Sequence, residues 1–125
     1  MTRAILLAAC LGLATGLPAV AADDEDFLVA TGGDLATLCA TGPDNPNHAA
    51  AIHMCQGYIV GAHQLHEAAV APTETGGFYC VPEPLPTRNE VTAGFTDWVS
   101  AEPARADLPA IEALMRFAAA TYPCE

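Results

Sequence analysis

Residues 48–71 read HAAAIHMCQGYIVGAHQLHEAAVA, a long run without proline in a chain that contains ten prolines. Apolar side chains recur along this run with a period close to 3.6 residues, which is the repeat of an amphipathic helix. The positions are Ile52, Cys55, Ile59, Ala62 and, one turn later, Leu65 or His66. The pattern predicts that this segment forms the longest helix of the protein.

The sequence before this helix predicts a turn and a shorter helix. Residues 41–47, TGPDNPN, combine the residue types that favour turns and interrupt helices. Ahead of them, Asp34 is a suitable cap for a helix that runs from Leu35 to Ala40. The first two helices would therefore form a hairpin across the turn.

The sequence after the long helix predicts a connector and a third helix. Residues 72–86 are rich in proline and glycine, so we expect them to form a loop. Thr87 and Glu90 then match a capping box, which opens a helix. The apolar residues of this helix lie on one stripe, and Glu102-Pro103 ends it. The stripe consists of Val91, Phe95, Trp98 and Val99.

A fourth helix closes the chain. Asp107 is the expected cap, and Pro109 is tolerated in a first helical turn. The apolar face comprises Ile111, Leu114, Met115, Ala118 and Tyr122. No segment shows the alternation of a strand, so the fold class predicted is all-α, a small bundle of about four helices.

Residues 1–22 have the pattern of a cleaved signal peptide. A positive start is followed by the apolar, uncharged stretch 4–20 and then by small residues before an acidic run. We expect cleavage after Ala21 or Ala22. Two alternatives stay open: a membrane anchor, because the apolar stretch approaches the length of a span, and a lipoprotein attached through Cys10.

Cleavage leaves an acidic lead-in, residues 23–32, which we expect to be loose, and a helical domain, residues 33–125. No membrane span remains, and the localisation expected is the periplasm. The exported part has three arginines against 15 acidic residues, a net charge of −12. This charge argues against nucleic acid and against an anionic membrane as partners, and it permits a basic protein.

Four cysteines remain in the exported chain, at positions 39, 55, 80 and 124. An even number of cysteines in a small exported domain is typical of a disulfide framework. Spacing alone leaves three pairings open. If each pair of successive helices forms an antiparallel hairpin, Cys39 lies near Cys55 and Cys80 lies near Cys124, and this geometry favours the pairing Cys39–Cys55 with Cys80–Cys124.

No group of residues predicts catalysis. Cys55 and the nearby His53 would point apart on a helix, and Ser100 lacks the motif of a nucleophile. His63, His66 and Glu67 are spaced to share a helical face and to hold a metal, although polar helix positions of this kind are common without one. We therefore expect no enzyme activity, no cofactor and no metal.

Gly57 and Gly61 lie four residues apart in the long helix. Each weakens a helix by up to about 1 kcal/mol relative to alanine. Close approach of another helix would compensate for this loss. Two interpretations follow, a helix crossing within the domain and a face that pairs two copies of the chain.

Several of these features recur in a fixed order. Asp34-Leu35 and Cys39 precede Cys55-x-Gly57-Tyr58-Ile59-x-Gly61, and then come Cys80-x-Pro82, Glu102-Pro103 and Tyr122-Pro123-Cys124. This pattern resembles the Rap/Tai family of immunity proteins over residues 33–124. The one departure is at Ala62-His63-Gln64-Leu65, where the family pattern leads us to expect an acidic residue near position 63.

The resemblance implies a disulfide-bonded helical protein that protects bacteria from a peptidoglycan amidase delivered by type VI secretion. It also implies frequent dimers and inhibition by a loop that plugs the active-site cleft of the amidase. On this basis the partner-binding residues are Glu102, Pro103 and Arg105, between the last two helices. Two alternatives are a periplasmic acid-stress chaperone and a metal-binding protein that uses His63, His66 and Glu67.

Overall fold

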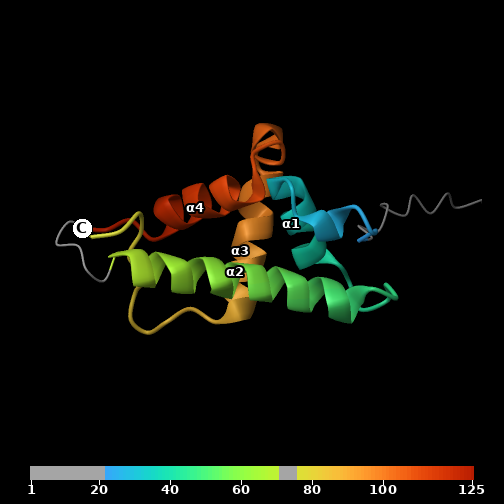
Figure 1. Cartoon of the computed structure of the whole chain (residues 1–125), viewed down its shortest axis with the longest axis horizontal. Coiled ribbons are helices and arrows are strands. Elements are labelled where there is room, and N and C mark those ends of the chain that lie inside the picture. Colours follow the sequence, from blue (N-terminus) through green and yellow to red (C-terminus); the bar gives the residue numbers. More distant parts are fainter. Residues whose placement is uncertain (1–21, 71–75) are drawn as a thin grey trace, which may run out of the picture.

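The computed structural model of the chain describes residues 22–70 and 76–125 (Figure 1). Four α-helices and two short 3-10 helices follow one another, and these residues form no strand beyond an isolated bridge between Thr31 and Pro109. The elements are η1 (Asp26–Leu28), α1 (Gly32–Ala40), α2 (His48–Val70), α3 (Arg88–Ser100), η2 (Pro103–Arg105) and α4 (Ala110–Thr121). The all-α prediction is confirmed, whereas residues 1–21 of the predicted signal peptide, Cys10 among them, lie outside the described residues.

The long helix α2 extends along the molecule, and the other helices are arranged beside it (Figure 1). Helix α1 contacts α2, α3 and α4, while α3 contacts α2 and α4. None of the helices in the described ranges is both long enough and apolar enough to cross a membrane.

The core lies where α1 meets the other three helices. Leu35 and Leu38 of α1, Cys55 of α2 and Phe95 of α3 are fully buried. The ring of Phe95 meets the edge of Phe117 of α4 at a centroid distance of 5.6 Å. An edge-to-face contact of this kind adds to the stabilisation that the buried area provides.

Helix α1 begins earlier than the sequence suggested. Its N-cap is Thr31, whose hydroxyl accepts a hydrogen bond from the Asp34 backbone N–H at 3.2 Å, while the Asp34 carboxylate accepts one from the Thr31 N–H at 2.9 Å. The prediction that Asp34 is the cap was wrong, because Asp34 is the second partner of a capping box.

Helix α4 begins without a side-chain cap, so the prediction that Asp107 caps it was also wrong. The N–H of Ala110 donates instead to the carbonyl of Ala30 at 3.1 Å, and the N–H of Gly32 donates to the carbonyl of Leu108 at 2.7 Å. The Ala30 carbonyl thus takes the place of the missing side-chain cap, and the Gly32 bond holds the segment just before α4. The lead-in is held against the domain at this point, in contrast to the loose segment expected.

Both predicted disulfides are present. Cys39–Cys55 joins α1 to α2, with an S–S distance of 2.03 Å. Cys80–Cys124 joins the connector to the end of the chain, where the Cys80 N–H also donates to the Tyr122 carbonyl at 2.8 Å. The pairing favoured from the hairpin geometry is confirmed.

Candidate functional site

The loop between α3 and α4 contains η2 and is anchored on two glycines at the start of α1. A Cβ on Gly32 would lie 2.7 Å from the Ala113 Cβ and 2.7 Å from the Arg105 carbonyl oxygen. The N–H of Gly33 donates to the Ala106 carbonyl at 2.9 Å. Only glycine permits this approach at position 32, so the loop rests directly on the backbone of α1.

Arg105 fixes the shape of this loop from within. Its guanidinium donates to the Trp98 carbonyl at 2.7 Å, bonds the Glu102 carboxylate at 3.0 Å and lies 4.2 Å from the centre of the Trp98 ring. A guanidinium that donates hydrogen bonds and stacks at the same time is held in one orientation. Arg105 therefore joins the end of α3 to the loop.

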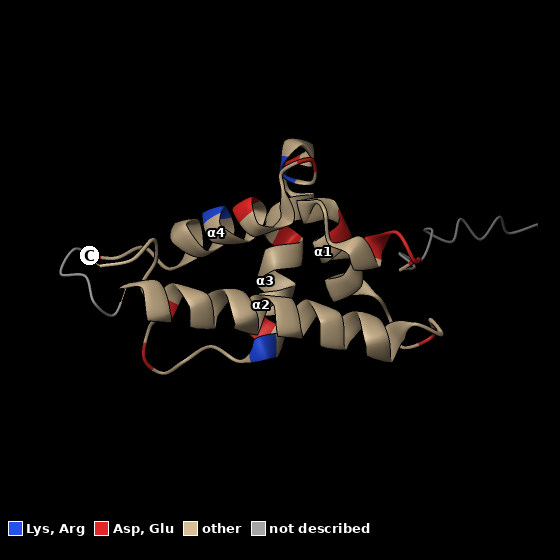
Figure 2. Cartoon of the chain, viewed as in Figure 1, with Lys and Arg blue, Asp and Glu red and all other residues tan. Residues whose placement is uncertain are grey.

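The three residues proposed for partner binding do not have equal exposure. The Arg105 side chain is 27% exposed and that of Glu102 is 58% exposed. Pro103 is exposed, and so is the neighbouring Ala104. The tip that a partner can reach therefore presents Glu102, Pro103 and Ala104, with Arg105 beneath them. In Figure 2 the ribbon is coloured for both acidic and basic residues in this loop.

His63, His66 and Glu67 come together as the sequence suggested, with one possible ligand atom of each within 4.8 Å of the others. His66 is buried and stacks on Tyr79, with ring centroids 4.0 Å apart. His63 Nδ1 lies 3.0 Å from the Tyr79 hydroxyl oxygen. Burial, and secondly the negative charge of Glu67, raise the pKa of Tyr79 above its ordinary value.

The hydrogen bonds of His66 oppose metal binding in this arrangement. His66 Nε2 accepts from the Phe78 N–H at 3.0 Å, so in the neutral ring the proton is on Nδ1. That N–H lies 3.5 Å from the Glu67 carboxylate and has no hydrogen-bond acceptor among the described residues. A metal beside Glu67 would have to bind the lone pair of Nδ1. Because the Phe78 N–H occupies Nε2, Nδ1 carries the proton and has no lone pair to offer. The cluster instead holds the segment around Gly77, where a Cβ would overlap the His66 ring.

The structure leaves the face of α2 around Gly57 and Gly61 open. A Cβ at either position would meet no atom of residues 22–70 or 76–125 within 4 Å. Met54 and Leu65 flank the glycines along the helix and are 40% and 69% exposed. The interpretation of the glycines as an internal helix crossing was therefore wrong. Figure 2 shows α2 almost free of charge, with Glu67 its only acidic or basic residue apart from histidines.

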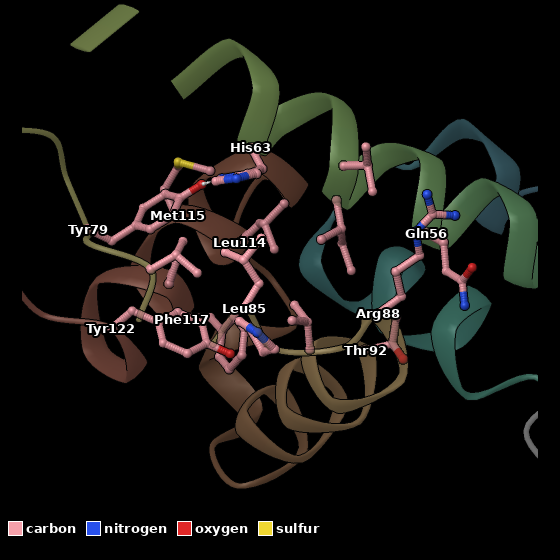
Figure 3. A pocket seen from close by; sticks show the side chains of 16 residues that line it. Gln56, His63, Tyr79, Leu85, Arg88, Thr92, Leu114, Met115, Phe117 and Tyr122 are labelled. Carbon is pink, nitrogen blue, oxygen red and sulfur yellow. Dashed lines mark hydrogen bonds between the residues drawn. The ribbon is translucent and has the colours of Figure 1, made fainter. Parts of the chain in front are cut away.

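An apolar pocket, which the sequence did not suggest, lies between α2, α3, α4 and the connector (Figure 3). Four separate segments contribute its walls, so no single sequence pattern could indicate it. Tyr122 is one of the lining residues, and burial, followed by the negative charge of Glu90, raises its pKa above the ordinary value.

The features described so far define a class: a small, disulfide-bonded, all-helical domain with a rigid charged loop at one end. Comparison with models of known protein families shows which family within this class the chain belongs to. The family model of Rap1a immunity proteins matches residues 31–124, and the chain belongs to this family. Neither a search of curated proteins nor a search of solved structures gave a match.

Proposed function

We propose that this protein is a periplasmic, non-enzymatic inhibitor of a peptidoglycan amidase that type VI secretion delivers. The observation that carries the proposal is the match to Rap1a immunity proteins over residues 31–124. An immunity protein acts by binding a secreted effector. The finer assignments, to an amidase and to the periplasm, rest on the motif order and on the expected signal peptide.

The loop around η2 supports inhibition by insertion into a cleft. Its base is fixed by the close contact with Gly32, and its interior is fixed by Arg105. A binding loop that is already ordered loses little conformational entropy when it binds. We therefore assign the contact with the active-site cleft to Glu102, Pro103 and Ala104, and a positioning role to Arg105.

The charge of the chain supports a basic partner. Four basic residues stand against 15 acidic ones, for a net charge of −11. Such a charge attracts an oppositely charged protein and accelerates association. The two disulfides agree with an oxidising compartment, as expected of an exported protein.

The open face of α2 supports a homodimer. Gly57 and Gly61 weaken an isolated helix, and a Cβ on either would contact none of the described residues, whereas Met54 and Leu65 expose apolar surface beside them. A second copy of α2 could approach closely over the glycines. Sedimentation of the wild type and of Gly61→Glu tests this, because a buried charge would separate the two copies. An unchanged oligomeric state would contradict the dimer at this face.

The amidase proposal is tested with the oxidised protein, residues 23–125, and a panel of secreted peptidoglycan amidases. We expect one of them to form a stable complex and to lose its activity. Glu102→Gln should weaken inhibition, whereas Glu83→Gln, a change of an exposed acid on the connector, should not. Inhibition that survives Glu102→Gln and Pro103→Ala together would contradict the loop mechanism. Absence of any inhibited amidase would contradict the amidase as target.

A further inference from the structure

The apolar pocket between α2, α3, α4 and the connector has a volume of about 160 Å³. Its inner wall consists of aliphatic and aromatic side chains, among them Ile59, Val91, Leu114 and Phe117. A buried apolar cavity of about 150 Å³ holds one benzene molecule. The pocket therefore accommodates a hydrocarbon body of about six to eight carbon atoms.

The two ends of the pocket differ in polarity (Figure 3). At one end, His63 and Tyr79 satisfy each other, because His63 Nδ1 lies 3.0 Å from the Tyr79 hydroxyl. At the other end, Gln56, Arg88 and Thr92 lie together at the pocket wall. A ligand that lies along the pocket thus has apolar contacts in the middle and hydrogen-bond donors at the Arg88 end.

Arg88 differs from the other arginines in the described part of the chain. Arg105 pairs with Glu102 and Arg116 pairs with Glu112, whereas Arg88 has no ion pair among residues 22–70 and 76–125. Among the residues that the structure describes, none with a carboxylate lines the pocket. In a chain with 15 acidic residues, an unpaired arginine beside an apolar pocket provides a local site for an anion.

We propose that this pocket binds a medium-chain fatty acid, with the acyl chain in the pocket and the carboxylate on the guanidinium of Arg88. The length of the chain follows from the volume, and the acid group follows from the charge at the pocket end. This function is separate from amidase inhibition, since Arg88 and the η2 loop lie at opposite ends of α3.

Because the protein is strongly acidic, a comparison of a charged and a neutral ligand head group tests the contact with Arg88. A net charge of −11 disfavours any anion that lacks a specific cationic contact. Without a role for Arg88, the neutral 1-octanol would bind more tightly than octanoate, because both have the same chain length and only octanoate is repelled. Preference for octanoate therefore requires the contact with Arg88.

The test is calorimetric titration of the oxidised protein with octanoate and with 1-octanol, with NMR to locate the ligand. We expect octanoate to bind with a Kd of about 10–100 µM, from the usual affinity per ligand atom. Arg88→Gln should weaken octanoate about tenfold and leave 1-octanol unchanged. Arg116→Gln is the matched control for loss of charge, and it should change neither affinity. Val60→Phe should fill the pocket and abolish both.

Three outcomes would overturn the proposal. One is the absence of saturable octanoate binding by the wild type up to the solubility limit. Another is equal octanoate affinity for the wild type and Arg88→Gln, which would remove the anion site. The third is a dimer that Val60→Phe dissociates and octanoate leaves intact, which would show that a second copy occupies the pocket. Each readout is independent of amidase inhibition.

Discussion

The glycines illustrate how one residue type serves different purposes in this fold. A Cβ at Gly32 would overlap the Ala113 Cβ and the Arg105 carbonyl, whereas a Cβ at Gly57 or Gly61 would contact nothing in the described part of the chain. The same substitution to alanine should therefore have opposite effects in the two places. The difference depends on tertiary contacts and could not be inferred from the sequence alone.

Gly57→Ala and Gly61→Ala should each raise the free energy of unfolding of the monomer by about 0.5–1 kcal/mol, because alanine favours the helix and clashes with nothing. Gly32→Ala should lower it, because either α1 or the loop must move. Urea denaturation of dilute samples measures all three. A loss of stability in Gly61→Ala would contradict an open face in the monomer.

The capping box of α3 links one carboxylate to pH. Hydrogen bonds from the Thr87 hydroxyl and from the Thr87 backbone N–H lower the pKa of Glu90 below its ordinary value. A carboxyl group whose pKa is lower in the folded state stabilises the fold above its unfolded pKa. This contribution is lost as the pH falls through the folded pKa.

Thr87→Ala should lower the free energy of unfolding at pH 7 by about 1 kcal/mol, through loss of the cap. It should also raise the pKa of Glu90 toward its ordinary value, which NMR titration of the side chain would show. The stability difference between this variant and the wild type should shrink in acid. Glu90→Gln is the control, since glutamine retains the box and does not titrate. A pKa of Glu90 that is unchanged in Thr87→Ala would contradict the assignment.

At the scale of elements, the sequence predicted helices better than their starts. The capping box of Thr87 and Glu90 is local, so its pattern was sufficient. The start of α4 was not predictable in this way, because its first N–H, that of Ala110, donates to the carbonyl of Ala30, far away in the sequence. The start of α1 was misjudged by three residues, since Asp34 is compatible both with a cap and with the third helical position.

The candidate site was predictable only in part, for a similar reason. The resemblance indicated Glu102, Pro103 and Arg105, and all three lie on one loop. The division between an exposed tip and a supporting Arg105 depends on the stacking with Trp98. The apolar pocket depends on four segments that meet only in the folded chain, and the burial of His66 depends on Tyr79 and Phe78.

The two disulfides constrain loops of different length. Their cysteines are 16 and 44 residues apart in the sequence. Loop-closure entropy alone assigns about 3 kcal/mol to the first bridge and about 4 kcal/mol to the second. Cys55 is fully buried, however, whereas Cys80 and Cys124 are exposed. Removal of the first bridge therefore also disturbs the core.

We expect the variant Cys39→Ala with Cys55→Ala to lose at least as much stability as Cys80→Ala with Cys124→Ala, despite its shorter loop. Urea denaturation of both double variants measures the two losses. In the wild type, the exposed Cys80–Cys124 bridge should be reduced first by a mild thiol, which mass spectrometry of alkylated peptides would show. Preferential reduction of Cys39–Cys55 would contradict the burial argument.

At the scale of the whole molecule, the excess of acidic residues is the dominant electrostatic feature. It is distributed over several elements and is not concentrated at the η2 loop (Figure 2). Charges remote from an interface act on the rate of encounter, while contacts within the interface act mainly on dissociation. The proposed mechanism therefore assigns the association rate to the overall charge and the dissociation rate to the η2 loop, and kinetic measurements can resolve the two.

The association rate constant with the inhibited amidase should fall at least about tenfold between low and high salt, because salt screens charges over about 10 Å at 0.1 M. The dissociation rate constant should change little. Asp24→Asn with Glu25→Gln, exposed in the lead-in, should slow association without faster dissociation. Glu102→Gln should mainly accelerate dissociation. Surface plasmon resonance at several salt concentrations gives both constants. If the lead-in variant accelerates dissociation as Glu102→Gln does, the lead-in contacts the partner directly, and inhibition by the η2 loop alone is contradicted.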